Sequence, residues 1–241
     1  MNNDVIGRIL KGSQNVLFSD LLVMLCQVFA IIIIFKLFRR DKLTYHFLTY
    51  CLAGFLLFFS GKLLYFFYDA TESSARYTET GNVAFAVIEY VVFYYYFKII
   101  LNSKILKAFM SVFLIPLLVA ASSFVVVVFS IKLADNDILE YSNFIISPEL
   151  LFLGIVCLFY YLELFRKKPL VKLTQSPSFW IVTSFFFYSL IITPFFIITN
   201  DEFKAAHRNV FFTLWTLHYI SFSILFIAIS NAFLCRKPLT T

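Results

Sequence analysis

Residues 82–98 read NVAFAVIEYVVFYYYFK, an apolar run that is nearly long enough to cross a bilayer and contains one acidic residue. Glu89 lies about two helical turns inside this run. An ionisable side chain at that depth costs at least about 2.5–3.5 kcal/mol on insertion scales, unless another group pairs with it or water reaches it. We therefore expect the rest of the chain to supply a polar partner for Glu89.

The composition places the whole chain among membrane proteins. Of its 241 residues, 61% are hydrophobic and 14% are charged, whereas soluble domains have about 45–50% apolar and about 25% charged residues. A membrane helix needs about 20 residues, so this length holds seven helices with short loops and no soluble catalytic domain. We expect an all-α integral membrane protein in which residues 1–241 form one domain, a single bundle of seven transmembrane helices.

Apolar runs separated by short polar loops predict where these helices lie. Residues 114–131 (LIPLLVAASSFVVVVFSI) contain no charged side chain, so the fourth span is expected to face lipid. The approximate limits of the seven predicted spans are 16–38, 44–68, 82–102, 106–131, 147–165, 179–199 and 209–234.

The distribution of basic residues predicts the orientation of the bundle. Thirteen Lys and Arg residues lie at or just after the ends of the first, third, fifth and seventh spans, whereas six lie in the N-terminal segment and the other three loops. Loops rich in Lys and Arg stay in the cytoplasm. We therefore expect the N-terminus outside and the C-terminus in the cytoplasm, in a bacterial cytoplasmic (inner) membrane. The net charge of +6 then reflects membrane orientation, and we expect no nucleic-acid partner.

Lys62 is the expected partner of Glu89. It lies six residues before the predicted end of the second span, and Glu89 lies seven residues after the predicted start of the third. Consecutive antiparallel helices would place the two side chains at matching depth, with Tyr65 on the same helical face as Lys62. One interpretation is a buried ion pair that fixes two helices together, and another is a pair that faces a ligand. In a third, Lys62 extends outward to the membrane surface and leaves Glu89 to a tyrosine or to water.

Further polar side chains are expected near this pair, in the outer half of the bundle. His218 and Trp215 share a face of the seventh span, while Asp20 and Gln27 share a face of the first. Pro194 interrupts the backbone hydrogen bonding of the sixth span and is a candidate hinge. Together these groups predict either a wet pocket that opens outward or a polar core whose groups satisfy one another.

Several kinds of chemistry are disfavoured by the sequence. The three histidines are expected at different depths and the four cysteines form no CxxC pair, whereas a zinc site needs several ligands at one place. Neither an HExxH helix nor a GxSxG turn is present. The seventh span also has no lysine for a retinal Schiff base. We expect no metal, no cofactor and no enzymatic activity.

Two segments carry a resemblance to known proteins. Residues 176–200 (SPSFWIVTSFFFYSLIITPFFIITN) and 214–237 (LWTLHYISFSILFIAISNAFLCRK) resemble small seven-helix membrane proteins of Bacteroidota-type bacteria. Similar bundles serve as membrane input modules of sensor histidine kinases. The resemblance implies a sensory or regulatory role, with any kinase as a separate partner because few residues follow the seventh span. The matching residues are Pro177, Phe179, Trp180, Tyr188, Trp215, His218 and Asn231.

The sequence thus predicts a non-enzymatic seven-helix membrane sensor or regulatory subunit. An outward-facing polar pocket would detect a ligand, and basic cytoplasmic loops would signal to a histidine kinase or another membrane or cytoplasmic partner. One alternative is a small proton-coupled transporter or permease in which Glu89 and His218 titrate. Another is a membrane anchor or effector that forms oligomers in the lipid bilayer, with Lys62 and Glu89 as a structural pair.

Overall fold

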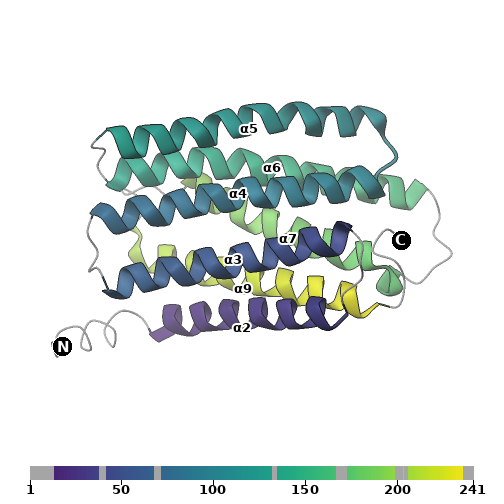
Figure 1. Cartoon of the computed structure of the whole chain (residues 1–241), viewed down its shortest axis with the longest axis horizontal. Coiled ribbons are helices and arrows are strands. Elements are labelled where there is room, and N and C mark those ends of the chain that lie inside the picture. Colours follow the sequence, from purple (N-terminus) through teal and green to yellow (C-terminus); the bar gives the residue numbers. More distant parts are fainter. Residues whose placement is uncertain are drawn as a thin grey trace.

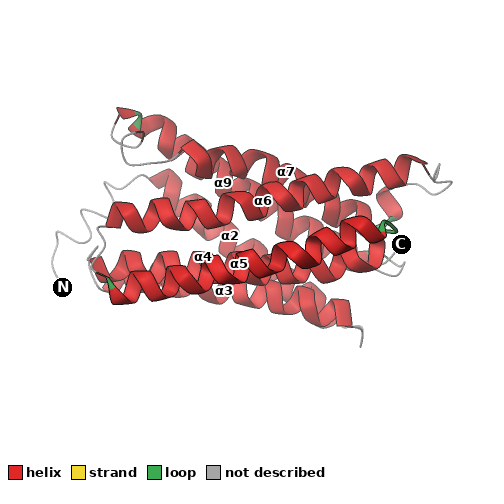
Figure 2. Cartoon of the chain, turned by 90° about the horizontal axis from the view of Figure 1, so that it is seen from above, coloured by secondary structure: helices red, strands yellow, loops and turns green. Residues whose placement is uncertain are grey.

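The computed structural model describes most of the chain and shows an all-helical fold in that part. Figures 1 and 2 show long helices running side by side along one common direction. The described residues are 14–37, 42–67, 72–131, 135–166, 173–198, 203 and 206–235, without the side chains of 14–18, 42, 62–67, 72–75, 135, 136, 174 and 208.

Seven helices in the described ranges are long and apolar enough to cross a membrane. This confirms the predicted fold at the level of seven candidate spans. A short 3₁₀ helix, η1 (Leu173–Gln175), precedes the sixth of them. The seven are α2 (Gln14–Lys36), α3 (Lys42–Phe67), α4 (Glu72–Ile100), α5 (Lys104–Ser130), α6 (Asp135–Arg166), α7 (Pro177–Ile198) and α9 (Arg208–Leu234).

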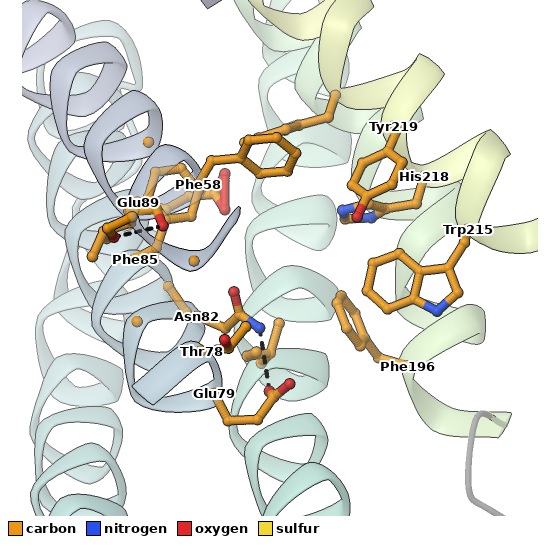
Figure 3. A pocket seen from close by; sticks show the side chains of 18 of the residues that line it. Phe58, Thr78, Glu79, Asn82, Phe85, Glu89, Phe196, Trp215, His218 and Tyr219 are labelled. Carbon is orange, nitrogen blue, oxygen red and sulfur yellow. Dashed lines mark hydrogen bonds between the residues drawn. The ribbon is translucent and has the colours of Figure 1, made fainter. Parts of the chain in front are cut away.

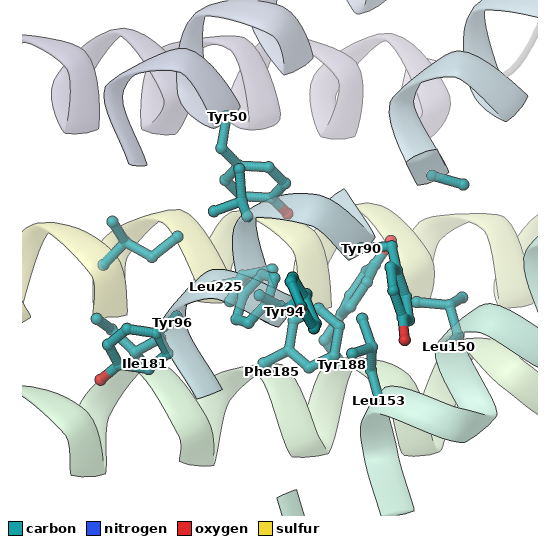
Figure 4. Packing of buried hydrophobic residues seen from close by; sticks show 14 of the residues in the cluster. Tyr50, Tyr90, Tyr94, Tyr96, Leu150, Leu153, Ile181, Phe185, Tyr188 and Leu225 are labelled. Atoms are coloured by element: carbon teal, nitrogen blue, oxygen red, sulfur yellow. The ribbon is translucent and has the colours of Figure 1, made fainter. Parts of the chain in front are cut away.

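Helix α4 lies in the middle of the bundle, between α3, α5 and α6, while α9 packs against α2 and α7. Its inner face is aromatic, and Tyr90, Phe93 and Phe97 are fully buried. The Phe93 ring lies 4.0 Å from the ring of Phe185 on α7, measured between centroids. Figure 4 shows Tyr188 of α7 directed into the same core. Aromatic packing thus joins the helices that surround the site.

Helix α5 lies at the periphery, as its sequence predicts. Its buried side chains form one stripe, and most of its other side chains are exposed. The start of the helix is fixed by Ser103, whose hydroxyl accepts a hydrogen bond from the backbone N–H of Leu106 at 3.2 Å. The buried stripe consists of Leu106, Met110, Leu117, Phe124 and Val128.

Two helices begin well before the predicted spans. The sequence predicts loops at residues 72–81 and 135–143, but these residues form the first turns of α4 and α6. An apolar run indicates which part of a helix is suited to lipid. The helix itself can continue into polar sequence beyond that run. Acidic residues such as Glu72 and Asp135 also favour a helix N-terminus through the helix dipole. Glu89 consequently lies near the middle of α4 rather than two turns from its start.

Candidate functional site

A cavity of about 330 Å³ lies between α3, α4, α7 and α9. It is found toward the end of the bundle at which α3 and α7 end and α4 and α9 begin. Figure 3 shows side chains of α4 and α9 facing each other across it. The residues that line it include Gly54, Phe58, Gly61, Thr78, Glu79, Asn82, Phe85, Glu89, Tyr188, Phe196, Trp215, His218, Tyr219 and Phe222.

Glu89 lies at the inner end of this pocket, and its partner is a tyrosine whose position the sequence did not identify. Its side chain is only 2% exposed. The hydroxyl of Tyr50 on α3 donates a hydrogen bond of 2.8 Å to Glu89 Oε1. The Tyr50 ring is held by stacking on Phe85 and Phe226, at centroid distances of 5.2 and 5.7 Å. Packing therefore fixes the donor that meets the buried carboxyl group.

The register of α3 against α4 separates Lys62 from Glu89. A methyl group built on Gly61 would lie 3.9 Å from Thr78 Oγ1, so this end of α3 lies beside the first turns of α4. Thr78 and Glu89 are eleven residues apart, about 16 Å along a helix. The error arose because depth was counted from Asn82, whereas α4 begins at Glu72. The side chains of Lys62 and of Tyr65 lie outside the described residues.

A second glutamate, which the sequence reasoning missed, lies beside Glu89. Glu149 on α6 is fully buried, and neither of its carboxylate oxygens has a hydrogen-bond partner among the described residues. It interacts electrostatically with Glu89, with Tyr90 and with Tyr188. A charged residue within an apolar run was the available signal. It was overlooked because the fifth span was predicted to begin at residue 147, which would place Glu149 at the membrane surface.

His218 lies on α9 and faces the α4 side of the pocket (Figure 3). Its ring is surrounded by aromatic side chains, with Trp215 at 5.4 Å, Phe196 at 5.9 Å and Tyr188 at 6.0 Å between centroids. No described residue makes a hydrogen bond to the buried Nδ1 atom. The structure thus brings Glu89, His218 and Trp215 to one pocket.

The two polar residues predicted on the first span lie behind the pocket wall. Asp20 is buried and shares a side-chain hydrogen bond with Tyr219, which lines the pocket. Gln27 is fully buried, and its Nε2 atom would lie 3.2 Å from a methyl group built on Gly54. Neither amide atom of Gln27 has a hydrogen-bond partner among the residues that the structure describes. α2 therefore contributes indirectly, through Tyr219 and Gly54.

The hinge candidate lies next to the pocket. Pro194 is exposed on α7, and the helix continues past it to Ile198. Tyr188 and Phe196, on either side of the proline in sequence, both line the cavity. A bend of α7 at this point would therefore alter the pocket, and the hinge itself stays a prediction.

A further carboxyl group lies closer to the mouth of the pocket. Glu79 Oε2 accepts a hydrogen bond of 2.6 Å from the hydroxyl of Ser142 on α6 and one of 3.2 Å from Asn82 Nδ2. The second of these is drawn in Figure 3. Sequence reasoning missed Glu79 as a site residue because it assigned this segment to a loop.

The pocket therefore combines carboxyl groups with aromatic faces. None of the described residues that line it is Lys or Arg. The guanidinium group of Arg76, one turn before Glu79, donates to the Val128 carbonyl of α5 at 3.4 Å. Within the described residues no three His, Cys, Asp or Glu side chains form a group that could hold a metal ion. The arrangement suits an organic cation, which carboxylates and aromatic faces both attract.

Comparison of the chain with protein-family models, with curated proteins and with solved structures finds no match. The resemblance of α7 and α9 to sensory seven-helix proteins therefore stays a prediction, and the function must be argued from the geometry of the pocket.

Proposed function

We propose that this chain is a non-enzymatic membrane sensor or regulatory subunit that binds a small organic cation in the pocket between α3, α4, α7 and α9. One observation carries the proposal, namely a cavity at one end of the bundle that places the Glu89 carboxyl group opposite the aromatic cluster around His218. Membrane insertion, an N-terminus on the outside and a location in a bacterial inner membrane are parts of this proposal, supported by the apolar helices and the loop charges.

The size and lining of the pocket support a small ligand. Its volume of about 330 Å³ is near the lower end of the usual range for ligand pockets, which is roughly 300–1,000 Å³. Trp215, Tyr188 and Phe196 offer ring faces of the kind that bind ammonium groups. Glu79 and Glu89 offer acceptors for the charge. A compact amine or quaternary ammonium ion satisfies both sets of contacts.

The output would pass along α7 to the basic side of the bundle. Tyr188 and Phe196 contact the ligand space on both sides of Pro194, so a bound cation would favour one bend of this helix. A signalling protein needs such an element with two stable arrangements. The receiving partner would be a separate histidine kinase or another protein that contacts the basic cytoplasmic loops.

Fluorescence of Trp215 provides a direct test. The chain has two tryptophans, so Trp180→Phe leaves Trp215 as the only indole reporter, and it lies in the pocket. The protein in lipid nanodiscs is titrated with choline and with its uncharged isostere, 3,3-dimethylbutan-1-ol. We expect choline to change the emission, and Glu89→Gln to weaken choline binding about tenfold, which corresponds to about 1.4 kcal/mol.

Two controls make this result specific. Glu140 is exposed on α6, and Glu140→Gln should leave the titration unchanged. The uncharged isostere should be insensitive to Glu89→Gln. The proposal is wrong if neither choline nor tetramethylammonium changes Trp215 emission, or if Glu89→Gln affects the charged and uncharged ligands equally.

A proton-coupled transporter is the second candidate, and the position of Glu89 and Glu149 favours it. Both lie near the middle of long helices, and transporters place their coupling-ion sites near the bilayer midplane. This function predicts flux of the cation in proteoliposomes driven by a proton gradient, with Glu89→Gln abolishing it. Binding without flux would leave the sensor as the better description.

A further inference from the structure

A buried pair of carboxyl groups lies deeper in the bundle than the ligand pocket. Glu89 is 2% exposed and Glu149 is fully buried, and the two groups interact electrostatically. They come from different helices, α4 and α6, which pack against each other. Of the two, only Glu89 lines the pocket. The pair therefore has one member that can be reached from the pocket and one that is enclosed.

The enclosed member has no described group to stabilise a negative charge. Both oxygens of Glu149 lack a hydrogen-bond partner among the described residues. The side chains of its neighbours Leu150 and Leu153 are buried and apolar (Figure 4). Ionised carboxylates in such surroundings are normally paired with a cation or hydrogen-bonded. The protonated form of Glu149 avoids this cost because it is uncharged.

We propose that Glu89 and Glu149 form a proton-binding site that holds one proton between them at neutral pH. Two neighbouring carboxyl groups in a poorly hydrated site do not both ionise, because each negative charge opposes the other. A metal ion is a weaker explanation, since within the described part of the chain no third acidic, His or Cys side chain completes a metal site.

The hydrogen bonds assign the proton to Glu149. Glu89 Oε1 accepts the Tyr50 hydroxyl hydrogen bond at 2.8 Å, which stabilises a carboxylate. Glu149 has no such donor among the described residues. Because neither Glu149 oxygen has a hydrogen-bond partner among the described residues, a water molecule relays the proton. On release, the O–H bond of Glu149 breaks as the water takes the proton, the water gives up one of its own protons to form a new O–H bond on Glu89, and Glu89 passes that proton to water in the pocket. Uptake runs through the same atoms in reverse.

The other titratable groups around the pair are aromatic. Tyr50 of α3, Tyr90 of α4 and Tyr188 of α7 each interact with one or both carboxyl groups. The hydroxyl of Tyr90 donates its hydrogen bond to the backbone carbonyl of Met110 on α5 at 2.6 Å, so this proton is not donated to either carboxyl group. His218 of α9 lies across the pocket. No described Lys or Arg makes a hydrogen bond or ion pair with either carboxyl group, so the proton is the available positive charge.

Infrared spectroscopy of the whole protein in lipid tests this site without any ligand. A protonated carboxylic acid gives a C=O stretching band that a carboxylate lacks, and exposed glutamates are ionised at neutral pH. We expect the wild-type protein to show such a band at neutral pH. The band should be absent in Glu149→Gln, present in Glu140→Gln, and shifted in Glu89→Gln because its neighbour has changed.

Several results would overturn the proposal. One is the absence of a protonated carboxyl band in the wild type, and another is persistence of the band in Glu149→Gln. A third is loss of the band when sodium chloride is added at constant pH, because this would identify a sodium site. If Glu149→Gln does not fold, Glu149→Asp should move the band, and an unmoved band would equally contradict the assignment. None of these measurements depends on the proposed sensor function, so failure of the cation titration would not affect them.

Discussion

The hydrogen bond from Tyr50 to Glu89 makes a quantitative prediction. Tyr50→Phe removes the hydroxyl group but keeps the ring that stacks on Phe85 and Phe226. A neutral hydrogen bond between membrane helices contributes about 0.6 kcal/mol on average. A bond to an ionised group is roughly twice as strong. If Glu89 is the ionised member of the carboxyl pair, Tyr50→Phe should lower the free energy of unfolding by about 1.2 kcal/mol.

Tyr90 provides a matched control for this measurement. It is also a fully buried tyrosine, but its hydroxyl donates to a neutral acceptor, the Met110 carbonyl, at 2.6 Å. Tyr90→Phe should therefore cost only about 0.6 kcal/mol. Both variants are compared with the wild type by reversible unfolding in mixed micelles, and a difference of about 0.6 kcal/mol between them is expected.

A double-mutant cycle with Glu89→Gln isolates the pair. In that background the acceptor is neutral, so the cost of Tyr50→Phe should fall to about that of Tyr90→Phe, which gives a coupling energy of roughly 0.6 kcal/mol. The reasoning is refuted if Tyr50→Phe costs no more than Tyr90→Phe in the wild-type background. It is also refuted if Glu89→Gln leaves the cost of Tyr50→Phe unchanged.

Two further predictions concern helix packing. A methyl group on Gly154 would lie 2.7 Å from Ser189 Oγ, so Gly154→Ala should destabilise the protein by about 1–3 kcal/mol. Adding Ser189→Ala should restore most of the melting temperature, and an unchanged melting temperature in the single variant would contradict the close approach of α6 and α7. Glu163 accepts the backbone N–H of Ser103 at 3.0 Å at the start of α5, so Glu163→Ala should cost about 1 kcal/mol. Glu140→Ala, at an exposed position, should change the free energy of unfolding by less than about 0.5 kcal/mol, and equal effects of the two variants would exclude the capping role.

The sequence was sufficient to identify the seven apolar helices but not where two of them begin. Hydropathy detects the part of a helix that suits lipid, and residues 72–81 and 135–143 are too polar to give that signal. This error had a large consequence for the site. It matched Glu89 with Lys62, because the depth of Glu89 was counted from residue 82 although α4 begins at Glu72, whereas the end of α3 was predicted to within one residue.

Pocket residues could be predicted from the sequence where their side chains are rare in an apolar run. Glu89, His218 and Trp215 stand out, and the structure brings them to one cavity. Tyr50 does not stand out, because the chain has 14 tyrosines and only the register of α3 against α4 selects it. Glu149 is also a charged residue next to an apolar run, but the predicted start of the fifth span at residue 147 placed it at a helix end, where a charged residue is ordinary.

A pocket that is reached from the non-cytoplasmic side is central to the proposed function, and thiol labelling tests this access directly. Asn82→Cys, at the pocket in the first half of α4, and Lys104→Cys, at the start of α5 beyond the other end of α4, are both at exposed positions. Each is introduced after the four native cysteines have been replaced. A membrane-impermeant maleimide should label residue 82 in intact cells and residue 104 only after lysis. Labelling of residue 104 in intact cells, or no labelling of residue 82 in either condition, would contradict the account.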